Sequence, residues 1–158
     1  MLKESLIENR SVKLNQTAKN WEEAIKIGTD MLVESGAIEP RYYDAIISMV
    51  KEMGPYIILA PGLAMPHARP EEGVNRTAFA LVTLTTPVAF ESEEEPVSVL
   101  ITLAGSDSDQ HMQGIMEITQ VLEDPDPNSL TGVDLEKIRR CQSAEEIYAV
   151  IDAALNNQ

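Results

Sequence analysis

The chain has 158 residues, of which 44% are hydrophobic and 24% are charged, and this size and balance predict one globular domain over residues 1–158. Its 12 basic and 26 acidic residues give a net charge of −14, which argues against nucleic acid binding through a broad basic surface and favours a basic protein partner. No apolar run reaches the ~20 residues that cross a bilayer, and the N-terminus lacks a signal-peptide pattern, so a cytoplasmic protein without membrane insertion is expected.

Two amphipathic helices are predicted in the first third of the chain, after a short edge strand over residues 11–14, where polar and apolar residues alternate. Asn20 is a capping residue three positions before Glu23, so the first helix begins there and runs toward Gly36. Pro40 opens the second helix, because proline is tolerated in a first turn, and residues 54–55 end it. The apolar stripes of these helices are Ala24, Ile25, Gly28, Met31 and Leu32, and then Tyr43, Ile46, Ile47 and Val50.

Three buried strands are predicted over residues 56–60, 77–84 and 97–104. Each is a β-branched or aliphatic run bounded by glycine, proline or acidic residues. In the third run, one face is apolar and the other carries residues that are smaller or more polar on average, and helices are expected to cover both faces of the sheet. The acidic run over residues 91–95 is predicted to be a solvated turn.

Two further helices are predicted in the last third of the chain. The first begins near residues 106–109, whose polar side chains are suited to capping, and a loop over residues 124–132 follows it. Ser143 and Glu146 form a capping box for the last helix. The apolar stripe of the first of these helices is Met112, Ile115, Met116, Thr119 and Leu122. Helices on either side of strands predict an α/β fold, a three-layer α/β/α sandwich with a central mixed β-sheet.

The part of the chain that most resembles a functional site is the segment from Pro61 to Pro70, Pro-Gly-Leu-Ala-Met-Pro-His-Ala-Arg-Pro. Its prolines and glycine exclude an ordinary helix and hold the connection in one shape, so His67 is expected to be rigidly presented. A neutral imidazole can act as a nucleophile without a separate strong base, which makes a phosphohistidine intermediate chemically feasible. From spacing alone, a structural or merely exposed loop histidine fits the pattern as well.

Three other polar residues are candidates for the same site. His111 follows the third strand at the start of a helix, where unpaired N–H groups and a second imidazole suit an incoming phosphate, although a capping or surface histidine also fits. Arg69 and Lys51 could bind phosphate oxygens. Arg69 also fits a solvated loop cation, and Lys51 fits a residue that favours its helix dipole.

Other catalytic patterns are missing from the sequence. It contains no P-loop, no Gly-x-Gly-x-x-Gly, no His-Glu-x-x-His and no Gly-x-Ser-x-Gly. Asp107, Asp109 and His111 could be drawn as metal ligands, but polar residues at a helix start are ordinary caps. Cys141 is the only cysteine, which excludes an intrachain disulfide and a thiolate metal cluster. No cofactor and no metal are therefore expected.

The segment from Pro61 to Arg69 resembles the phosphorylation-site segment of the mannitol/fructose-type IIA family, the EIIA type 2 proteins of sugar phosphotransferase systems. The similarity covers nearly the whole chain, and five segments resemble the ascorbate-type branch most closely: Glu39-Pro-Arg-Tyr-Tyr43, Gly54-Pro-Tyr56, Pro70-Glu-Glu-Gly-Val74, Leu81-Val-Thr-Leu84 and Gly114-Ile-Met116. By this resemblance, His67 is the phosphorylated histidine and His111 is a second active-site histidine. The mannitol branch has an active-site arginine where this sequence has Lys51, and Arg69 is expected to take part of its role.

The resemblance implies a relay of phosphoryl groups between proteins. Phosphoenolpyruvate phosphorylates enzyme I, which phosphorylates the carrier HPr, which phosphorylates IIA on histidine. IIA then supplies the IIB component, which phosphorylates sugar entering through the IIC membrane permease. HPr and IIB are therefore the expected partners, and ascorbate is the expected sugar. Two alternatives stay open: a regulatory phosphoprotein of the same fold that binds protein targets according to its phosphorylation state, and a metal-dependent hydrolase.

Overall fold

A five-stranded mixed sheet forms the centre of the computed structural model, which describes residues 1–90 and 95–156. The strand order is β1-β4-β5-β3-β2; β1 runs parallel to β4 and β3 parallel to β5, and the other neighbours are antiparallel. The strands are β1 (Val12–Gln16), β2 (Ile58–Ala60), β3 (Leu63–Ala64), β4 (Ala78–Val88) and β5 (Val97–Ala104). The predicted edge strand is confirmed as β1, whereas residues 91–94 of the predicted acidic turn lie outside the described residues.

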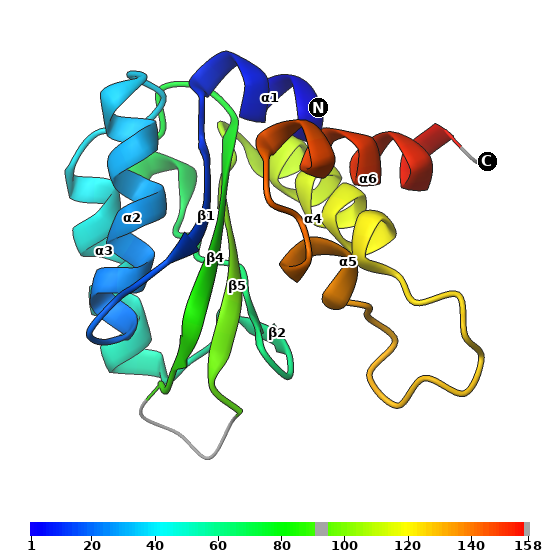
Figure 1. Ribbon diagram of the computed structural model, residues 1–158. Coiled ribbons are helices and arrows are strands. Elements are labelled where there is room, and N and C mark those ends of the chain that lie inside the picture. The colour runs from blue at the N-terminus through cyan, green and yellow to red at the C-terminus, as the bar shows by residue number, and fades with distance from the viewer. Residues whose placement is uncertain (91–94, 157–158) are drawn as a thin grey trace.

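Helices cover both faces of this sheet and complete three layers (Figure 1). One face carries α2 (Trp21–Glu34) and α3 (Arg41–Met53). The other carries α1 (Leu2–Asn9), α4 (Ser108–Leu122), α5 (Glu136–Arg139) and α6 (Ala144–Asn156). A single 3₁₀ turn, η1 (Pro70–Glu72), follows the proline-rich segment. The predicted three-layer α/β/α sandwich is confirmed.

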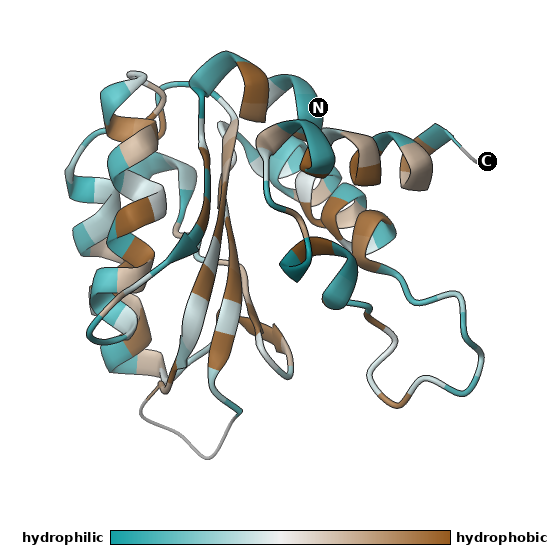
Figure 2. Cartoon of the chain, viewed as in Figure 1, coloured by the Kyte–Doolittle hydropathy of each residue, from teal (hydrophilic) through white to brown (hydrophobic). Residues whose placement is uncertain are grey.

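Strand β5 lies between the two hydrophobic cores. Figure 2 shows hydrophobic residues along β4 and β5 and on helix faces turned toward them. All eight residues of β5 are buried. Leu100 belongs to the core under α2 and α3, whereas Ile101 and Leu103 belong to the core under α1, α4 and α6. The prediction that helices cover both faces of this strand is confirmed.

Helix α4 begins where the sequence predicts but buries a different face. Asp107 caps it by accepting the N–H of Gln110 at 2.8 Å. Met112 and Met116 of the predicted stripe are 55% and 66% exposed, because the helix packs through the face of Gly114 and Ile118 instead. A Cβ atom on Gly114 would lie 2.8 Å from a methyl group of Leu103, so the missing side chain lets α4 approach β5 closely.

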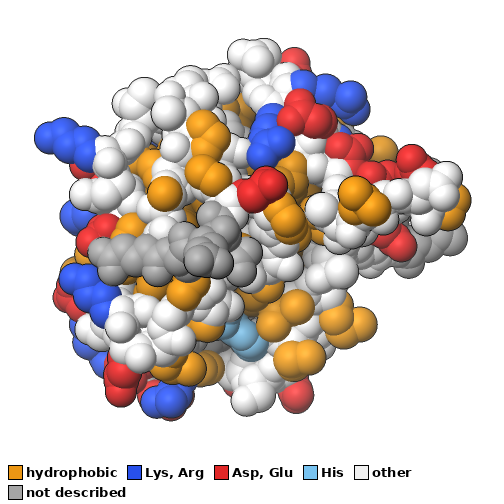
Figure 3. All heavy atoms as spheres, turned by 90° about the horizontal axis from the view of Figure 1, so that it is seen from below, with side chains coloured by type: hydrophobic (Ala, Val, Ile, Leu, Met, Phe, Trp, Pro, Cys, Tyr) orange, Lys and Arg blue, Asp and Glu red, His pale blue; other side chains and the backbone are white. Residues whose placement is uncertain are grey.

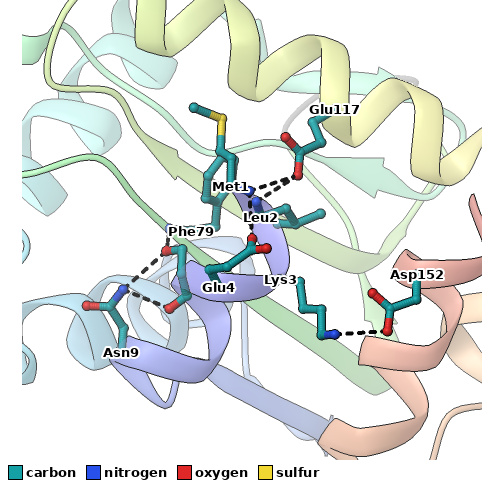
Figure 4. Close-up of polar contacts among 9 residues, drawn as sticks. Met1, Leu2, Lys3, Glu4, Asn9, Phe79, Glu117 and Asp152 are labelled. Carbon is teal, nitrogen blue, oxygen red and sulfur yellow. Dashed lines mark hydrogen bonds and ion pairs between the residues drawn. The ribbon is translucent and has the colours of Figure 1, made fainter. Parts of the chain in front are cut away.

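Helix α1, which the sequence patterns above did not predict, is held by contacts with distant parts of the chain (Figure 4). The N–H of Leu2 donates to Glu117 of α4 at 2.8 Å, and Lys3 pairs with Asp152 of α6 at 2.9 Å. Leu2 and Leu6 are buried in the core beneath. An eight-residue helix is too short to be stable alone, so tertiary packing holds α1.

The short strand β3 brings the proline-rich segment to one edge of the sheet. Leu63 pairs with Val99 and Ala64 with Leu100, in parallel. The carboxyl ends of β3 and β5 therefore lie at the same edge, where α/β sheets usually hold their ligands. β3 continues into the segment of His67, and β5 continues into the turn before α4.

Candidate functional site

A cavity of about 390 Å³ opens where β3 and β5 end. His67 and His111 both line it, with their ring centroids 5.1 Å apart and their planes tilted by 56°. Figure 3 shows imidazole surface in a hollow bordered by hydrophobic side chains. The structure thus brings together the two histidines that the sequence predicts as partners. They share the cavity with Met49, Tyr56, Ala68, Arg69, Pro70, Ser108 and Met112.

The imidazole of His67 is oriented by the carbonyl group two residues before it. Its Nδ1 lies 2.7 Å from the carbonyl oxygen of Met65. Because a carbonyl oxygen can only accept, Nδ1 carries the hydrogen and donates it. Nε2 of the neutral ring is then left with its lone pair. This geometry makes Nε2 the nucleophilic atom of His67.

Tyr56 holds His67 from a second side. Its hydroxyl donates to the carbonyl oxygen of His67, and its ring meets the imidazole nearly edge-on, with centroids 5.1 Å apart. Burial raises the pKa of Tyr56 to about 12, so the hydroxyl keeps its hydrogen and remains a donor. Sequence reasoning placed Tyr56 at a strand start and missed it as a site residue. The only signal was its place in the family-like segment Gly54-Pro-Tyr56.

His111 stands in the first turn of α4, on the opposite wall of the cavity. A Cβ atom on Gly105 would lie 2.9 Å from the Cα atom of His111, so glycine at this turn allows the helix to start so close to β5. Nδ1 of His111 is buried and has no hydrogen-bond partner among residues 1–90 and 95–156. Because a buried N–H without a partner is rarer in proteins than a buried acceptor without one, we assign the hydrogen of the neutral ring to Nε2. His111 therefore offers one N–H from Nε2.

Burial keeps both imidazoles neutral near neutral pH. It is the main cause that lowers the pKa of His67; the hydrogen bond to Met65 opposes this shift, and the nearby His111 adds to it. Burial also lowers the pKa of His111. Both neutral states suit the site, since neutral His67 presents a lone pair and neutral His111 a single donor.

We expect both histidines to titrate below the ordinary histidine value of 6.5. A buried ring resists protonation, so the neutral nucleophile persists as the pH falls through 6.5 and is lost only below the lowered pKa of His67. Ring ¹⁵N chemical shifts followed through a pH titration measure both midpoints, and a His111→Gln variant assigns the signals. A His67 midpoint above 6.5 would contradict burial as the dominant influence.

Arg69 lines the cavity, whereas Lys51 does not. Arg69 is exposed, and no hydrogen bond or ion pair of its side chain occurs within the described part of the chain. Lys51 lies instead at a separate hollow of about 90 Å³. Met49 of the same helix does line the cavity, and a residue two positions later is turned by about 200° around a helix axis. The structure thus gathers His67, His111 and Arg69, but not Lys51.

A metal site is not formed by the residues that the structure describes, because no three His, Cys, Asp or Glu side chains gather there. Asp107, which could be drawn as a ligand, instead caps α4. The metal-dependent hydrolase therefore lacks a ligand set within residues 1–90 and 95–156.

None of the helices in residues 1–90 and 95–156 has the length and apolar character of a membrane span.

Exposed methionines flank the opening of the cavity. Met49 and Met112 line it from α3 and α4, and Met53 and Met116 continue these two helix faces one turn further. Met53, Met112 and Met116 are 63%, 55% and 66% exposed. We call these four residues the methionine rim. Such an apolar, adaptable surface around a reactive group is typical of contact with another protein.

Comparison with known proteins shows similarity to one protein family over nearly the whole chain. The family model described as "Phosphoenolpyruvate-dependent sugar phosphotransferase system, EIIA 2" matches residues 5–154. The ascorbate-specific PTS system EIIA component of Shigella boydii serotype 4 is 46% identical over 153 residues, which cover 96% of this chain and 95% of that protein.

Solved structures extend this similarity to the fold. The Streptococcus mutans protein designated PTS IIA(PtxA) is 42% identical, with a TM-score of 0.89 over 99% of this chain and 96% of that one. The mannitol-specific cryptic phosphotransferase enzyme IIA CmtB from Escherichia coli is 33% identical, with a TM-score of 0.78 over 92% of this chain and 94% of that one.

Proposed function

The chain belongs to the EIIA 2 family of the phosphoenolpyruvate-dependent sugar phosphotransferase system, and we propose that it takes a phosphoryl group onto His67 and passes it to another protein. The observation that carries this proposal is the free Nε2 of His67, which the Met65 carbonyl leaves as the reactive atom in a cavity shared with His111. We assign residues 1–158 to one EIIA domain, of which the family model matches residues 5–154.

Phosphoryl acceptance on His67 needs no separate base. The Nε2 lone pair attacks the phosphorus of the donor's phosphohistidine; the new N–P bond forms as the donor's N–P bond breaks, and that electron pair returns to the donor imidazole. No proton has to leave Nε2. The N–H at Nδ1 keeps its hydrogen bond to the Met65 carbonyl, and this hydrogen bond stabilises the positive charge that the ring gains. The reverse steps deliver the group to an acceptor, and a phosphohistidine on His67 is the intermediate.

Three groups of the cavity stabilise the transferred phosphoryl oxygens in this mechanism. His111 donates from Nε2, and Arg69 supplies an exposed positive charge in the lining of the cavity. Ser108 stands in the first turn of α4, where backbone N–H groups have no intrahelical partner and the helix dipole favours an anion. Lys51 receives no role here, because it lies at a different hollow.

The partners of this proposal are HPr as donor and a IIB component as acceptor, in the cytoplasm. Both must bring a phosphorylated residue to His67, and the methionine rim offers them an apolar contact surface. The net charge of −14 speeds the approach of a basic carrier, while screening beyond roughly 8–10 Å leaves the nearby donors to bind the phosphate. We propose ascorbate as the sugar that the downstream IIB and IIC components handle, since the ascorbate-specific EIIA component of Shigella boydii is 46% identical.

Transfer between purified proteins tests this proposal. With phosphoenolpyruvate, enzyme I and HPr, the chain is expected to gain one acid-labile phosphoryl group, seen by intact mass. That group is then expected to pass rapidly to an ascorbate-type IIB and slowly to a mannitol-type IIB, which serves as the control. Failure to become phosphorylated would overturn the phosphocarrier role. Full phosphorylation without transfer to the ascorbate-type IIB would favour the regulatory alternative.

A further inference from the structure

Every backbone carbonyl oxygen around His67 has a polar group of the protein within hydrogen-bond distance. The Met65 carbonyl oxygen lies next to Nδ1 of His67, and the Pro66 carbonyl accepts the N–H of Leu103 at 3.0 Å. The carbonyl oxygen of His67 accepts the Tyr56 hydroxyl, and that of Ala68 lies 3.2 Å from the Tyr42 hydroxyl. The N–H of Met65 also donates, to the carbonyl of Ile57 at 2.8 Å. Two of these partners are tyrosine hydroxyls, and only Tyr56 lines the cavity.

Tyr42 is a fully buried residue of α3 whose hydroxyl joins two separate segments. It accepts the N–H of Ala68 at 2.9 Å, and its oxygen lies 2.9 Å from the carbonyl oxygen of Leu103. The single hydroxyl hydrogen has its shorter contact with Leu103 rather than with the carbonyl of Ala68. The hydroxyl therefore bridges Ala68 and Leu103, as acceptor to one and donor to the other.

The two bridged segments are those that carry the two histidines. Ala68 directly follows His67. Leu103 lies near the end of β5, from which the chain passes through Gly105 to the first turn of α4 and His111. Together with the direct hydrogen bond from the Leu103 N–H to the Pro66 carbonyl, one buried oxygen atom thus links two chain segments whose imidazoles must both reach the same phosphoryl group.

We propose that Tyr42 is a positioning residue, whose hydroxyl sets His67 in register with His111 for phosphoryl transfer without itself touching the phosphate. The inference rests on the proposed function, because register between the histidines matters only if both act on one group. Tyr42 differs from Tyr56 in this respect: Tyr56 contacts the imidazole of His67 directly, whereas Tyr42 acts only through the backbone.

Tyr42→Phe and Tyr43→Phe form a matched pair for testing this role. Each removes one hydroxyl from α3. The Tyr43 hydroxyl, however, donates to the carbonyl of Glu22 in α2, and neither of these residues lines the cavity. With phosphorylated HPr as donor, kcat of Tyr42→Phe is expected to fall about 10- to 100-fold, the effect of a small misplacement of reacting groups. KM for the donor and the activity of Tyr43→Phe should stay unchanged, because the Tyr42 residue is fully buried and the Tyr43 hydroxyl lies outside the cavity.

A double-mutant cycle separates positioning from general stability. In a His111→Ala background, Tyr42→Phe is expected to lose most of its effect on kcat, since the partner with which it aligns His67 is gone. The assay is run at low temperature with the folded fraction measured by circular dichroism. Additive effects of the two substitutions would overturn the proposal. So would a Tyr42→Phe variant that is unfolded under these conditions, because the hydroxyl would then serve folding itself.

Amide exchange tests the bridge without any partner protein. Tyr42→Phe is expected to speed hydrogen exchange of the Ala68 amide at least tenfold, because its acceptor is removed, while Tyr43→Phe leaves that amide protected. Unchanged protection of Ala68 would refute the bridge even if the wild-type chain carries phosphate. Conversely, faster exchange in a chain that accepts no phosphate would place the failure in the proposed function.

Discussion

Replacing His67 by alanine is expected to abolish phosphoryl acceptance. The substitution removes the only Nε2 lone pair that the structure orients, through the 2.7 Å bond to the Met65 carbonyl, as a nucleophile in the cavity. His111 is not expected to take over, because its Nε2 carries a hydrogen and serves as a donor. Intact mass spectrometry after incubation with phosphoenolpyruvate, enzyme I and HPr measures the phosphorylated fraction.

The control for His67→Ala is the His67→Gln variant, which keeps a polar side chain of similar length but has no nucleophilic nitrogen. It is expected to be equally inactive. Both variants should stay folded, because the side chain of His67 makes one hydrogen bond to the described residues, and a single bond contributes about 0.5–1.5 kcal/mol to stability. Wild-type phosphorylation in either variant would show that the nucleophile lies elsewhere.

Replacing His111 by alanine is expected to slow phosphoryl transfer about 10²- to 10³-fold without abolishing it, which is the usual effect of removing one oriented donor from a reacting anion. The ring of His111 lies 5.1 Å from that of His67, centroid to centroid, so a phosphoryl group on Nε2 of His67 comes within its reach. Rapid-quench measurement of a single transfer from phosphorylated HPr gives the rate.

The His111→Gln variant tests the assigned donor atom. The amide nitrogen of glutamine reaches about as far along the side chain as Nε2 of histidine and carries hydrogens, so this variant is expected to recover much of the lost rate. Equal rates for His111→Gln and His111→Ala would mean that a hydrogen from Nε2 is not what the site uses. A His111→Ala rate equal to that of wild type would remove His111 from the mechanism.

Much of the fold follows from local patterns in the sequence. The cap at Asn20, the proline at the start of α3 and the glycine after it gave both helices that cover one face of the sheet. The apolar run of β5 predicted a strand covered on both faces, and all its residues are buried. These elements carry their own start and stop signals, so their positions can be read without knowledge of the rest of the chain.

Elements that depend on distant contacts could not be predicted in the same way. Helix α1 has eight residues and is stabilised by α4, α6 and the sheet. The predicted buried face of α4 is wrong, because its apolar stripe omits Gly114, at which a Cβ atom would lie 2.8 Å from Leu103. The exposed Met112 and Met116 then looked like core residues, whereas they form part of the methionine rim.

In the candidate site, too, some features follow from local sequence patterns and others depend on distant contacts. Dense prolines around His67 predicted a rigid loop. The sequence positions of His111 and Arg69 made them candidates before the family resemblance supported them, and the structure places both at the same cavity. Met65 acts through its backbone carbonyl, which orients the ring of His67, and no pattern of side chains in the sequence reveals this contact. Tyr42 was missed because the predicted stripe of α3 contained Tyr43, and one position on a helix decides which hydroxyl reaches the loop.

The most direct measurement is the ¹H–¹⁵N spectrum of the phosphorylated protein, labelled with ¹⁵N in its two histidines. It reports which ring nitrogen is bonded to phosphorus, through the phosphorus–nitrogen coupling and the chemical-shift change. Because the Met65 carbonyl holds the hydrogen of Nδ1, the coupling is expected at Nε2 of His67, with Nδ1 still protonated and His111 unmodified. Coupling at Nδ1 of His67, or at either nitrogen of His111, would contradict the orientation on which the phosphocarrier mechanism depends.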